Sequence, residues 1–405
     1  MRLFINSLGA STGGGLTYIR NVIPQFTRMP GVELIVLLRP ELRGEFRNQA
    51  QVEFVECEAS WVRRLWYEQV QLRRIVRDFR ADVLLSTGNF ALKSSPVPQI
   101  LLSRNSIYTC ADFYRDLLAR REYRGWADTR WRAAMARKSI HWADITVAPT
   151  EAFAAALRRW SGSPDVVAIH HGFDREQFSS DGTPLSSEVR DKLNASEGSL
   201  KLLFVSHYNY YRNFETLIRA LPLIREALNH RAFKLLLTCK LRGGENPGAY
   251  RPDAAAKLVR ELEVGDIVVE LGAIPYRQLH QIYRQADIYV TPAYTETFAH
   301  PLVESMSCAV PVVASDLAVH REICGDTALY FARFSPEELA ARVLQLVSSD
   351  SLRATLSAKG VERASGFSWR KHVDDLFALA GSLAANRNQN SLSSRDRQAP
   401  PASSC

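Results

Sequence analysis

The feature that most constrains the fold of this chain is a pair of short apolar runs with a helix-starting proline between them. Residues 285–292 (QADIYVTP) and 310–314 (VPVVA) are rich in β-branched and apolar side chains, which favours two buried strands. Pro301 suits the first position of a helix, because its missing N–H needs no partner there. We therefore expect a helix over residues 301–308. This order predicts an α/β unit, whose ligands collect at the carboxyl ends of the strands.

The loop before this helix predicts a ligand site. Glu296 and Glu304 stand eight positions apart, on either side of the expected helix start. Ala299 and His300 are poorer caps than Ser or Asp, so we expect the first N–H groups of the helix to lack a protein partner and to be able to bind an anion. In the alternative interpretation, Glu304 only complements the helix macrodipole from the first turn and Glu296 is a solvated loop residue. The flanking strands favour the anion site.

The length and composition exclude several classes of protein. The 405 residues, with 46% apolar and 23% charged side chains, are typical of a globular protein of two to three domains. The chain shows neither a run of ~18 apolar residues nor the apolar core of a signal peptide, so we expect a cytoplasmic protein. Six cysteines without a C-x-x-C pair indicate neither a disulfide framework nor a structural metal site. The absence of a D-x-D motif disfavours sugar-nucleotide enzymes that bind a metal through it.

The net charge of +8 is concentrated in the first half of the chain. Residues 1–175 contain about 25 Lys and Arg against about 17 Asp and Glu, and the densest segment, residues 115–138, interleaves basic side chains with Tyr123, Trp126 and Trp131. Such a segment could lie on the anionic inner face of the cell membrane. A solvated helix face, with arginines covering aromatic packing, explains it equally well. No nucleic-acid-binding motif is present, which disfavours a nucleic-acid partner.

A glycine-rich loop follows the first predicted strand, residues 3–6. Residues 9–15 (GASTGGG) precede a helical pattern that begins at Leu16. Gly14 and Gly15 would let the backbone approach a phosphate closely at the helix start. The spacing fits neither G-x-G-x-x-G nor the P-loop, so a flexible turn remains the alternative.

Strand-like runs alternate with helical segments in two cycles, which predicts two Rossmann-like domains with parallel sheets covered by helices. Residues 176–199 are rich in Ser, Gly and Asp, as in a linker. We expect a first domain, a linker, a second domain, a helix that returns to the first domain, and a disordered tail, over residues 1–178, 179–199, 200–365, 366–385 and 386–405.

Residues 286–316 (ADIYVTPAYTETFAHPLVESMSCAVPVVASD) and 320–331 (HREICGDTALYF) closely resemble the nucleotide-sugar half of retaining GT-B glycosyltransferases of family 4. The signature of that family is E-x7-E before a PVVAS-like strand. The resemblance extends over most of the chain, with counterparts at the glycine loop and at residues 143–152, 171–174, 205–218 and 367–369. It implies two Rossmann-like domains that face each other across a cleft, with a nucleotide diphosphate sugar held mainly on the second.

The resemblance also implies roles for the acidic and basic residues. Glu304 would bind the ribose hydroxyls, and Glu296 would contact the donor sugar near its reacting carbon. Arg212 stands where the family uses Lys to bind the diphosphate, and its guanidinium could make that contact bidentately. We take Glu296 and Arg212 as the catalytic residues, and we place Gly14 and Gly15 on the donor side.

The loop of the signature would supply the remaining donor contacts. Backbone N–H groups of Thr297, Phe298, Ala299 and His300 are expected to hold phosphate and sugar oxygens. Retention in this family is commonly explained by same-face attack, in which the departing phosphate takes the proton of the acceptor. That mechanism requires neither a metal nor a protein nucleophile, so we expect no cofactor.

The chain departs from the family pattern at several positions. His207 stands where Arg is usual; we still assign it to the donor site, with a charge that depends on pH. Ala299 and Ala309 replace glycines. Where many members place a functional His on the acceptor side, this chain has Arg104 and Asn105, which we place on that side.

We therefore expect a retaining glycosyltransferase that acts in envelope polysaccharide or glycolipid synthesis, with a saccharide or lipid-linked acceptor. A degenerate GT-B protein that binds a nucleotide sugar or a partner without catalysis is the alternative. A scaffold that used only the basic face of the first half would explain the charge but not the E-x7-E block.

Overall fold

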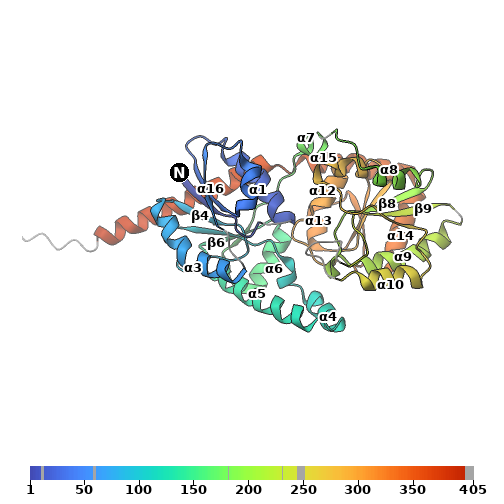
Figure 1. Cartoon of the computed structure of the whole chain (residues 1–405), viewed down its shortest axis with the longest axis horizontal. Helices are drawn as coiled ribbons and strands as arrows, with labels where there is room; N and C mark the ends of the chain where they lie inside the picture. Colours follow the sequence, from blue (N-terminus) through green and yellow to red (C-terminus); the bar gives the residue numbers. More distant parts are fainter. Residues whose placement is uncertain (11–12, 58–60, 181, 230, 244–250, 397–405) are drawn as a thin grey trace, which may run out of the picture. The chain divides into compact units, whose positions relative to one another are not determined.

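The computed structural model describes residues 1–10, 13–57, 61–180, 182–229, 231–243 and 251–396. The chain forms two compact units, each built on its own sheet (Figure 1). Unit 1 comprises Met1–Thr109, Ala127–His171 and Trp369–Cys405, and unit 2 comprises Cys110–Trp126 and Gly172–Ser368.

The described part of unit 1 contains a parallel sheet of seven strands in the order β3-β2-β1-β4-β5-β6-β7. The strands are β1 (Arg2–Asn6), β2 (Glu33–Leu38), β3 (Val52–Glu56), β4 (Val83–Ser86), β5 (Gln99–Leu102), β6 (Ile145–Ala148) and β7 (Val166–Ala168). Most of these strands are buried along their length, as in β2 (ELIVLL), because helices cover both faces of a parallel sheet.

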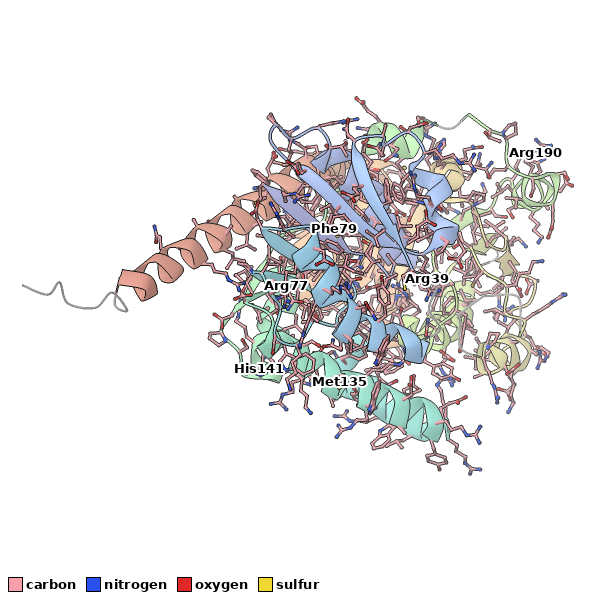
Figure 2. All side chains as sticks on the ribbon, turned by 60° about the vertical axis from the view of Figure 1, so that its left-hand side comes forward. Arg39, Arg77, Phe79, Met135, His141 and Arg190 are labelled. Atoms are coloured by element: carbon pink, nitrogen blue, oxygen red, sulfur yellow. The ribbon has the colours of Figure 1, made fainter. Side chains whose placement is uncertain are left out.

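Alternate residues of β1 build two separate cores in unit 1. Leu3 and Ile5 pack with α1 (Gly13–Phe26) and α16 (Trp369–Asp396), which lie side by side (Figure 1). Phe4 faces the opposite side and packs with α3 (Trp61–Asp78). Phe79, which is labelled in Figure 2, directly follows α3. Its ring lies 6.3 Å from that of Phe4. The other helices are α2 (Pro40–Arg43), η1 (Gly44–Phe46), η2 (Ser106–Tyr108), α6 (Glu151–Ser161) and α5 (Tyr123–Trp142), which begins in unit 2.

The described part of unit 2 contains a parallel sheet of six strands in the order β10-β9-β8-β11-β12-β13. The strands are β8 (Leu200–Phe204), β9 (Phe233–Leu237), β10 (Val268–Glu270), β11 (Ile288–Thr291), β12 (Val312–Ser315) and β13 (Ala328–Phe331). The helices are α4 (Ala111–Ala119), α7 (Arg175–Ser179), α8 (Ser187–Asn194), η3 (Tyr210–Arg212), α9 (Phe214–Ala227), α10 (Asp253–Glu261), η4 (Tyr276–Gln278), α11 (Leu279–Tyr283), α12 (His300–Ser307), α13 (Ala318–Cys324), α14 (Pro336–Val347) and α15 (Asp350–Ser365). Two helix-covered parallel sheets confirm the predicted pair of Rossmann-like domains.

The domain boundaries differ from the expected ones in three places. Residues 110–126 cluster with unit 2 although they precede the expected linker. The expected linker, residues 179–199, contains α8, because Ser186 caps this helix and Val189 and Leu193 are buried on one face. Helix α16 belongs to unit 1 and continues to Asp396, into the segment expected to be disordered from residue 386. The end of that expected tail, residues 397–405, lies outside the described residues.

Candidate functional site

The candidate site of unit 2 lies where its strand order reverses. The chain runs from β8 outward through β9 and β10, and then returns to place β11 on the other side of β8. In parallel α/β sheets this switch point, at the carboxyl ends of the strands, is the usual ligand position. The loops after β8 and β11 therefore meet, and the Tyr294 N–H donates to the Tyr211 carbonyl at 3.0 Å. These two loops carry most of the residues predicted to contact a donor.

The structure brings together the two residues predicted to be catalytic. Arg212, at the end of η3, forms an ion pair through Nη1 with Oε1 of Glu296 in the loop after β11. Their side chains are only 18% and 10% exposed, so the pair is largely withdrawn from water. The second carboxylate oxygen of Glu296 accepts a hydrogen bond from the Thr297 N–H at 3.3 Å. The Arg212 guanidinium lies 4.9 Å from the centre of the Tyr211 ring.

Asn213, to which sequence reasoning gave no role, fixes the turn that carries Arg212. Its backbone is left-handed, with φ 56° and ψ 44°, a conformation that Asn adopts more readily than most residues. Its amide nitrogen donates to the carbonyls of Pro292 at 3.0 Å and Arg333 at 2.7 Å. Its amide oxygen accepts from the Thr216 hydroxyl at 2.8 Å. A polar Asn directly before an apolar helix start was the available signal.

The start of α12 has the geometry that glycine usually provides. The helix begins at His300, one residue earlier than expected, and Ala299 is its N-cap, with φ 62° and no side-chain capping bond. Ala309 also has a positive φ, of 59°. These are the two positions where the family resemblance leads one to expect glycine, which adopts such angles without a steric cost. Glu304 lies in the second turn of α12, so it is too far from the helix start to be explained by the macrodipole.

Glu304 is buried rather than open to solvent. The residue is only 3% exposed. The Tyr283 hydroxyl donates to its Oε2 at 2.9 Å. Burial raises the pKa of Glu304 from 4.5 to about 7, against the lowering effect of this hydrogen bond. The carboxyl group therefore changes its charge near neutral pH.

The two aromatic residues of the signature loop pack against each other. The ring of Phe298, which is 1% exposed, lies 4.7 Å from that of His300 and 5.5 Å from that of Phe367. Phe298 therefore anchors the loop in the core of unit 2. We expect its contribution to ligand contact to come from the backbone alone.

His207 lies on the exposed part of the loop after β8. Loss of hydration, followed by repulsion from Arg212, lowers the pKa of its ring. The ring is thus neutral at pH 7 and does not replace the positive charge that Arg provides in the family pattern.

The predicted residues of unit 1 lie at a switch point of their own, between β1 and β4. Arg104 donates to the Gly14 carbonyl at 3.1 Å and to the Thr87 carbonyl at 2.7 Å, and so holds the glycine loop. A Cβ atom at Gly15 would lie 3.2 Å from the Ala10 Cα, a tight contact that glycine avoids. Ser11 and Thr12 of the same loop lie outside the described residues.

Asn105, expected on the acceptor side, has a structural role in unit 1. Its side chain caps η2 by accepting from the Ile107 N–H at 3.3 Å. The described residues contain no group of three or more His, Cys, Asp and Glu side chains placed to bind a metal ion. Within the same ranges, no helix is both long and apolar enough to cross a membrane.

Two family models and several known glycosyltransferases are similar to this chain. Residues 186–363 match the family Glycosyl transferases group 1, and residues 12–177 match Glycosyltransferase Family 4. A D-inositol 3-phosphate glycosyltransferase from Corynebacterium aurimucosum is 27% identical over 63% of this chain and 62% of its own length. The match thus spans about three-fifths of that relative.

Solved structures share the fold over nearly the whole chain. Sucrose-phosphate synthase from Thermosynechococcus elongatus has a TM-score of 0.73 at 18% identity, over 95% of this chain and 100% of that one. Anabaena HepE in complex with UDP-glucose has a TM-score of 0.71 at 15% identity, over the same shares. The two family matches together cover both units, and the chain therefore belongs to the family 4 glycosyltransferases with the GT-B fold.

Proposed function

We propose that this protein transfers a sugar from a nucleotide diphosphate sugar to an acceptor hydroxyl, with retention of configuration at the sugar. The observation that carries the proposal is the Arg212–Glu296 pair at the switch point of unit 2. A guanidinium suits a diphosphate, and a carboxylate suits sugar hydroxyls. The pair thus places the two complementary groups of a donor site side by side. HepE, which shares the fold, has been solved with UDP-glucose.

In the proposed reaction, the bond between the sugar carbon and the diphosphate oxygen breaks. The acceptor oxygen bonds to that carbon on the same face, and its proton passes to the departing phosphate. Arg212 and the amides at the start of α12 stabilise the charge that develops on the nucleoside diphosphate. Glu296 lies near the oxocarbenium-like carbon, and Glu304 accepts from the ribose hydroxyls. The proposal uses neither a metal nor a covalent intermediate.

The donor can be identified with a thermal-shift panel of UDP, GDP and ADP sugars, because a bound donor raises the unfolding midpoint. Transfer is then measured with the donor that stabilises the protein. Glu296→Ala should abolish turnover, and Arg212→Ala should weaken binding of the nucleoside diphosphate about tenfold or more. Unchanged turnover in Glu296→Ala would refute the catalytic role. Donor binding without transfer by the unaltered protein would instead support the non-catalytic alternative.

We further propose an envelope polysaccharide or glycolipid acceptor, reached from an anionic membrane surface. Arg137 and Lys138 of α5 are exposed, and Trp131 on the same helix is 45% exposed. Side chains with nitrogen tips project outward from α5 around Met135 (Figure 2). Part of the basic segment has another role, because Arg120 forms ion pairs within unit 2. Co-sedimentation with phosphatidylglycerol vesicles should occur at low salt and weaken as salt is added; no binding at low salt would refute this surface.

A further inference from the structure

A helix from the first half of the sequence packs against the loops of the candidate donor site. The chain enters unit 2 at Cys110, forms α4, and leaves unit 2 after Trp126. Phe113 of α4 is fully buried, and its ring meets the ring of Tyr211 edge to face at 6.2 Å. Helix α4 therefore contacts the residue that directly precedes Arg212.

The carboxylate of Asp116 connects α4 to the loop of Glu296. Its Oδ2 accepts a hydrogen bond from the Tyr294 hydroxyl at 2.9 Å, and Tyr294 lies two residues before Glu296. Its Oδ1 accepts from Nε of Arg120, just beyond α4, at 2.6 Å. Burial, followed by the Asp116 charge, raises the pKa of Tyr294, so the phenol keeps its proton and donates throughout the neutral range.

Arg120 carries the connection onward to the turn of Arg212. Its Nη1 lies 3.1 Å from Oε1 of Glu215, in the first turn of α9. Its guanidinium stacks 4.2 Å from the centre of the Tyr210 ring, at the start of η3. The Tyr208 hydroxyl donates to the same Glu215 oxygen at 2.7 Å. One guanidinium thus holds both ends of the short segment that contains Arg212.

These charged groups are largely withdrawn from water. The side chains of Asp116 and Arg120 are each 22% exposed, and that of Glu215 is 16% exposed. In such surroundings a hydrogen-bonded network favours a single arrangement of its members. Removal of one partner leaves another polar group without its bond, which is costly. The network can therefore fix the distance between the two loops more firmly than a surface ion pair can.

We propose that Asp116, Arg120 and Tyr294 are positioning residues for the donor site. They hold the turn of Arg212 and the loop of Glu296 at a fixed separation, so that both side chains reach one donor. The strands fix only where each loop begins, and the two loops share a backbone hydrogen bond between Tyr294 and Tyr211. A misplacement of about 1 Å can reduce an enzymatic rate by about a hundredfold, so this separation matters for transfer. The inference rests on the proposed function.

The test compares two variants that each lose one phenolic hydroxyl in unit 2. Tyr294→Phe removes the bond to Asp116 and keeps the ring, which packs 5.4 Å from the ring of Phe334. Tyr330→Phe is the matched control, because its hydroxyl donates to the Gly325 carbonyl at 2.6 Å and its ring belongs to β13. Asp116→Asn serves as a second variant that removes the charge from the same contact.

Hydrogen–deuterium exchange reports on the two loops without requiring activity. We expect faster exchange over residues 208–214 and 293–299 in Tyr294→Phe and Asp116→Asn, and no change there in Tyr330→Phe. In the transfer assay, kcat of Tyr294→Phe should fall about tenfold, whereas its thermal unfolding midpoint should shift no more than that of the control. Asp116→Asn should likewise lower kcat, while its thermal unfolding midpoint shifts no more than that of the control.

Two results would overturn the inference. One is unchanged exchange in both loops of Tyr294→Phe and Asp116→Asn. The other is an equal loss of kcat in Tyr294→Phe and Tyr330→Phe, which would indicate a general effect of stability. If the unaltered protein neither binds nor transfers any nucleotide sugar, the proposed function fails, and the exchange comparison still decides the loop contact.

Discussion

The contribution of Glu304 to the stability of this protein should fall between pH 5.5 and pH 8 because its carboxyl group is buried. Its pKa is raised from 4.5 to about 7, mainly through burial. Between these two pH values the folded state binds more protons at this site than the unfolded state does. Ionisation of Glu304 therefore favours unfolding as pH rises, which is the opposite of the behaviour of a salt-bridged carboxylate. With these two pKa values, the contribution of Glu304 to the free energy of unfolding falls by about 2 kcal/mol from pH 5.5 to pH 8.

The perturbation that isolates this contribution is Glu304→Gln. Glutamine has nearly the same shape and can still accept the hydrogen bond from Tyr283, which measures 2.9 Å in the structure. Glutamine does not titrate, so no charge forms on the buried side chain at high pH, and the free energy of unfolding is not lowered by it. Urea unfolding at pH 5.5, 6.5, 7.5 and 8, followed by circular dichroism, gives the free energy of both proteins. The variant should gain about 2 kcal/mol relative to the unaltered protein between the ends of this series.

Donor binding provides a second measurement of the same group. If the ionised carboxylate accepts the ribose hydroxyls, only the ionised fraction of Glu304 binds well. With a pKa of about 7, that fraction rises about tenfold from pH 6 to pH 8, and the Kd of a nucleotide sugar should fall by the same factor. Glu304→Gln should show no such trend. A free-energy difference between the two proteins that is independent of pH would refute the reasoning, because Glu304 would then titrate at its ordinary pKa.

Two further predictions concern the backbone and the core. Ala299→Gly and Ala309→Gly should each raise the free energy of unfolding by up to about 1 kcal/mol, because φ is positive at both positions. The control Ala341→Gly, at an exposed helical position, should lower it by about 1 kcal/mol. A lower free energy of unfolding in all three variants would contradict the prediction. Tyr18→Phe should lower the free energy of unfolding by about 1–2 kcal/mol, because the Tyr18 hydroxyl lies 2.9 Å from Nε2 of buried His372. Chemical denaturation measures all of these changes, and nucleotide binding should remain unchanged in Tyr18→Phe.

The central strands and the site loops were predictable because their signals are local. Buried parallel strands give near-continuous apolar runs, and the runs at residues 285–292 and 310–314 correspond to β11 and β12. Once strands are parallel, the loops that follow them gather at one edge of the sheet. The meeting of Arg212 and Glu296 follows from that topology together with the adjacency of β8 and β11.

The elements that sequence reasoning missed lack such a signal. Strand β3 (VEFVE) lies at the edge of its sheet, and Glu53 and Glu56 interrupt its apolar residues, so it forms no continuous apolar run. Helix α4 has an apolar face, and the periodicity of such a face does not say which sheet it packs against. The burial of Glu304 against Tyr283, 21 residues earlier, is a tertiary contact. Spacing alone suggested a first-turn carboxylate at the helix start.

The Arg212–Glu296 pair has a consequence for how the proposed donor site distinguishes its ligands. A diphosphate that engages Arg212 must replace the carboxylate of Glu296, whose side chain is only 10% exposed. A nucleoside diphosphate leaves that carboxylate without its cationic partner, which is costly in a largely buried site. A nucleotide sugar carries hydroxyls that can donate to it. The site should therefore prefer the intact donor over the nucleoside diphosphate that is released after transfer.

Glu296→Gln tests this preference, because it removes the charge and frees Arg212 while keeping the shape of the side chain. The variant should bind the nucleoside diphosphate several-fold more tightly, a change of about 1 kcal/mol. In this variant, the Kd of the nucleoside diphosphate should approach the Kd of the nucleotide sugar, so that the ratio of the two values shifts towards one. Isothermal titration with both ligands measures that ratio, and Arg212→Ala should weaken binding of both. Weaker binding of the nucleoside diphosphate by Glu296→Gln would contradict the exchange of partners, since it would mean that the carboxylate helps to hold the diphosphate.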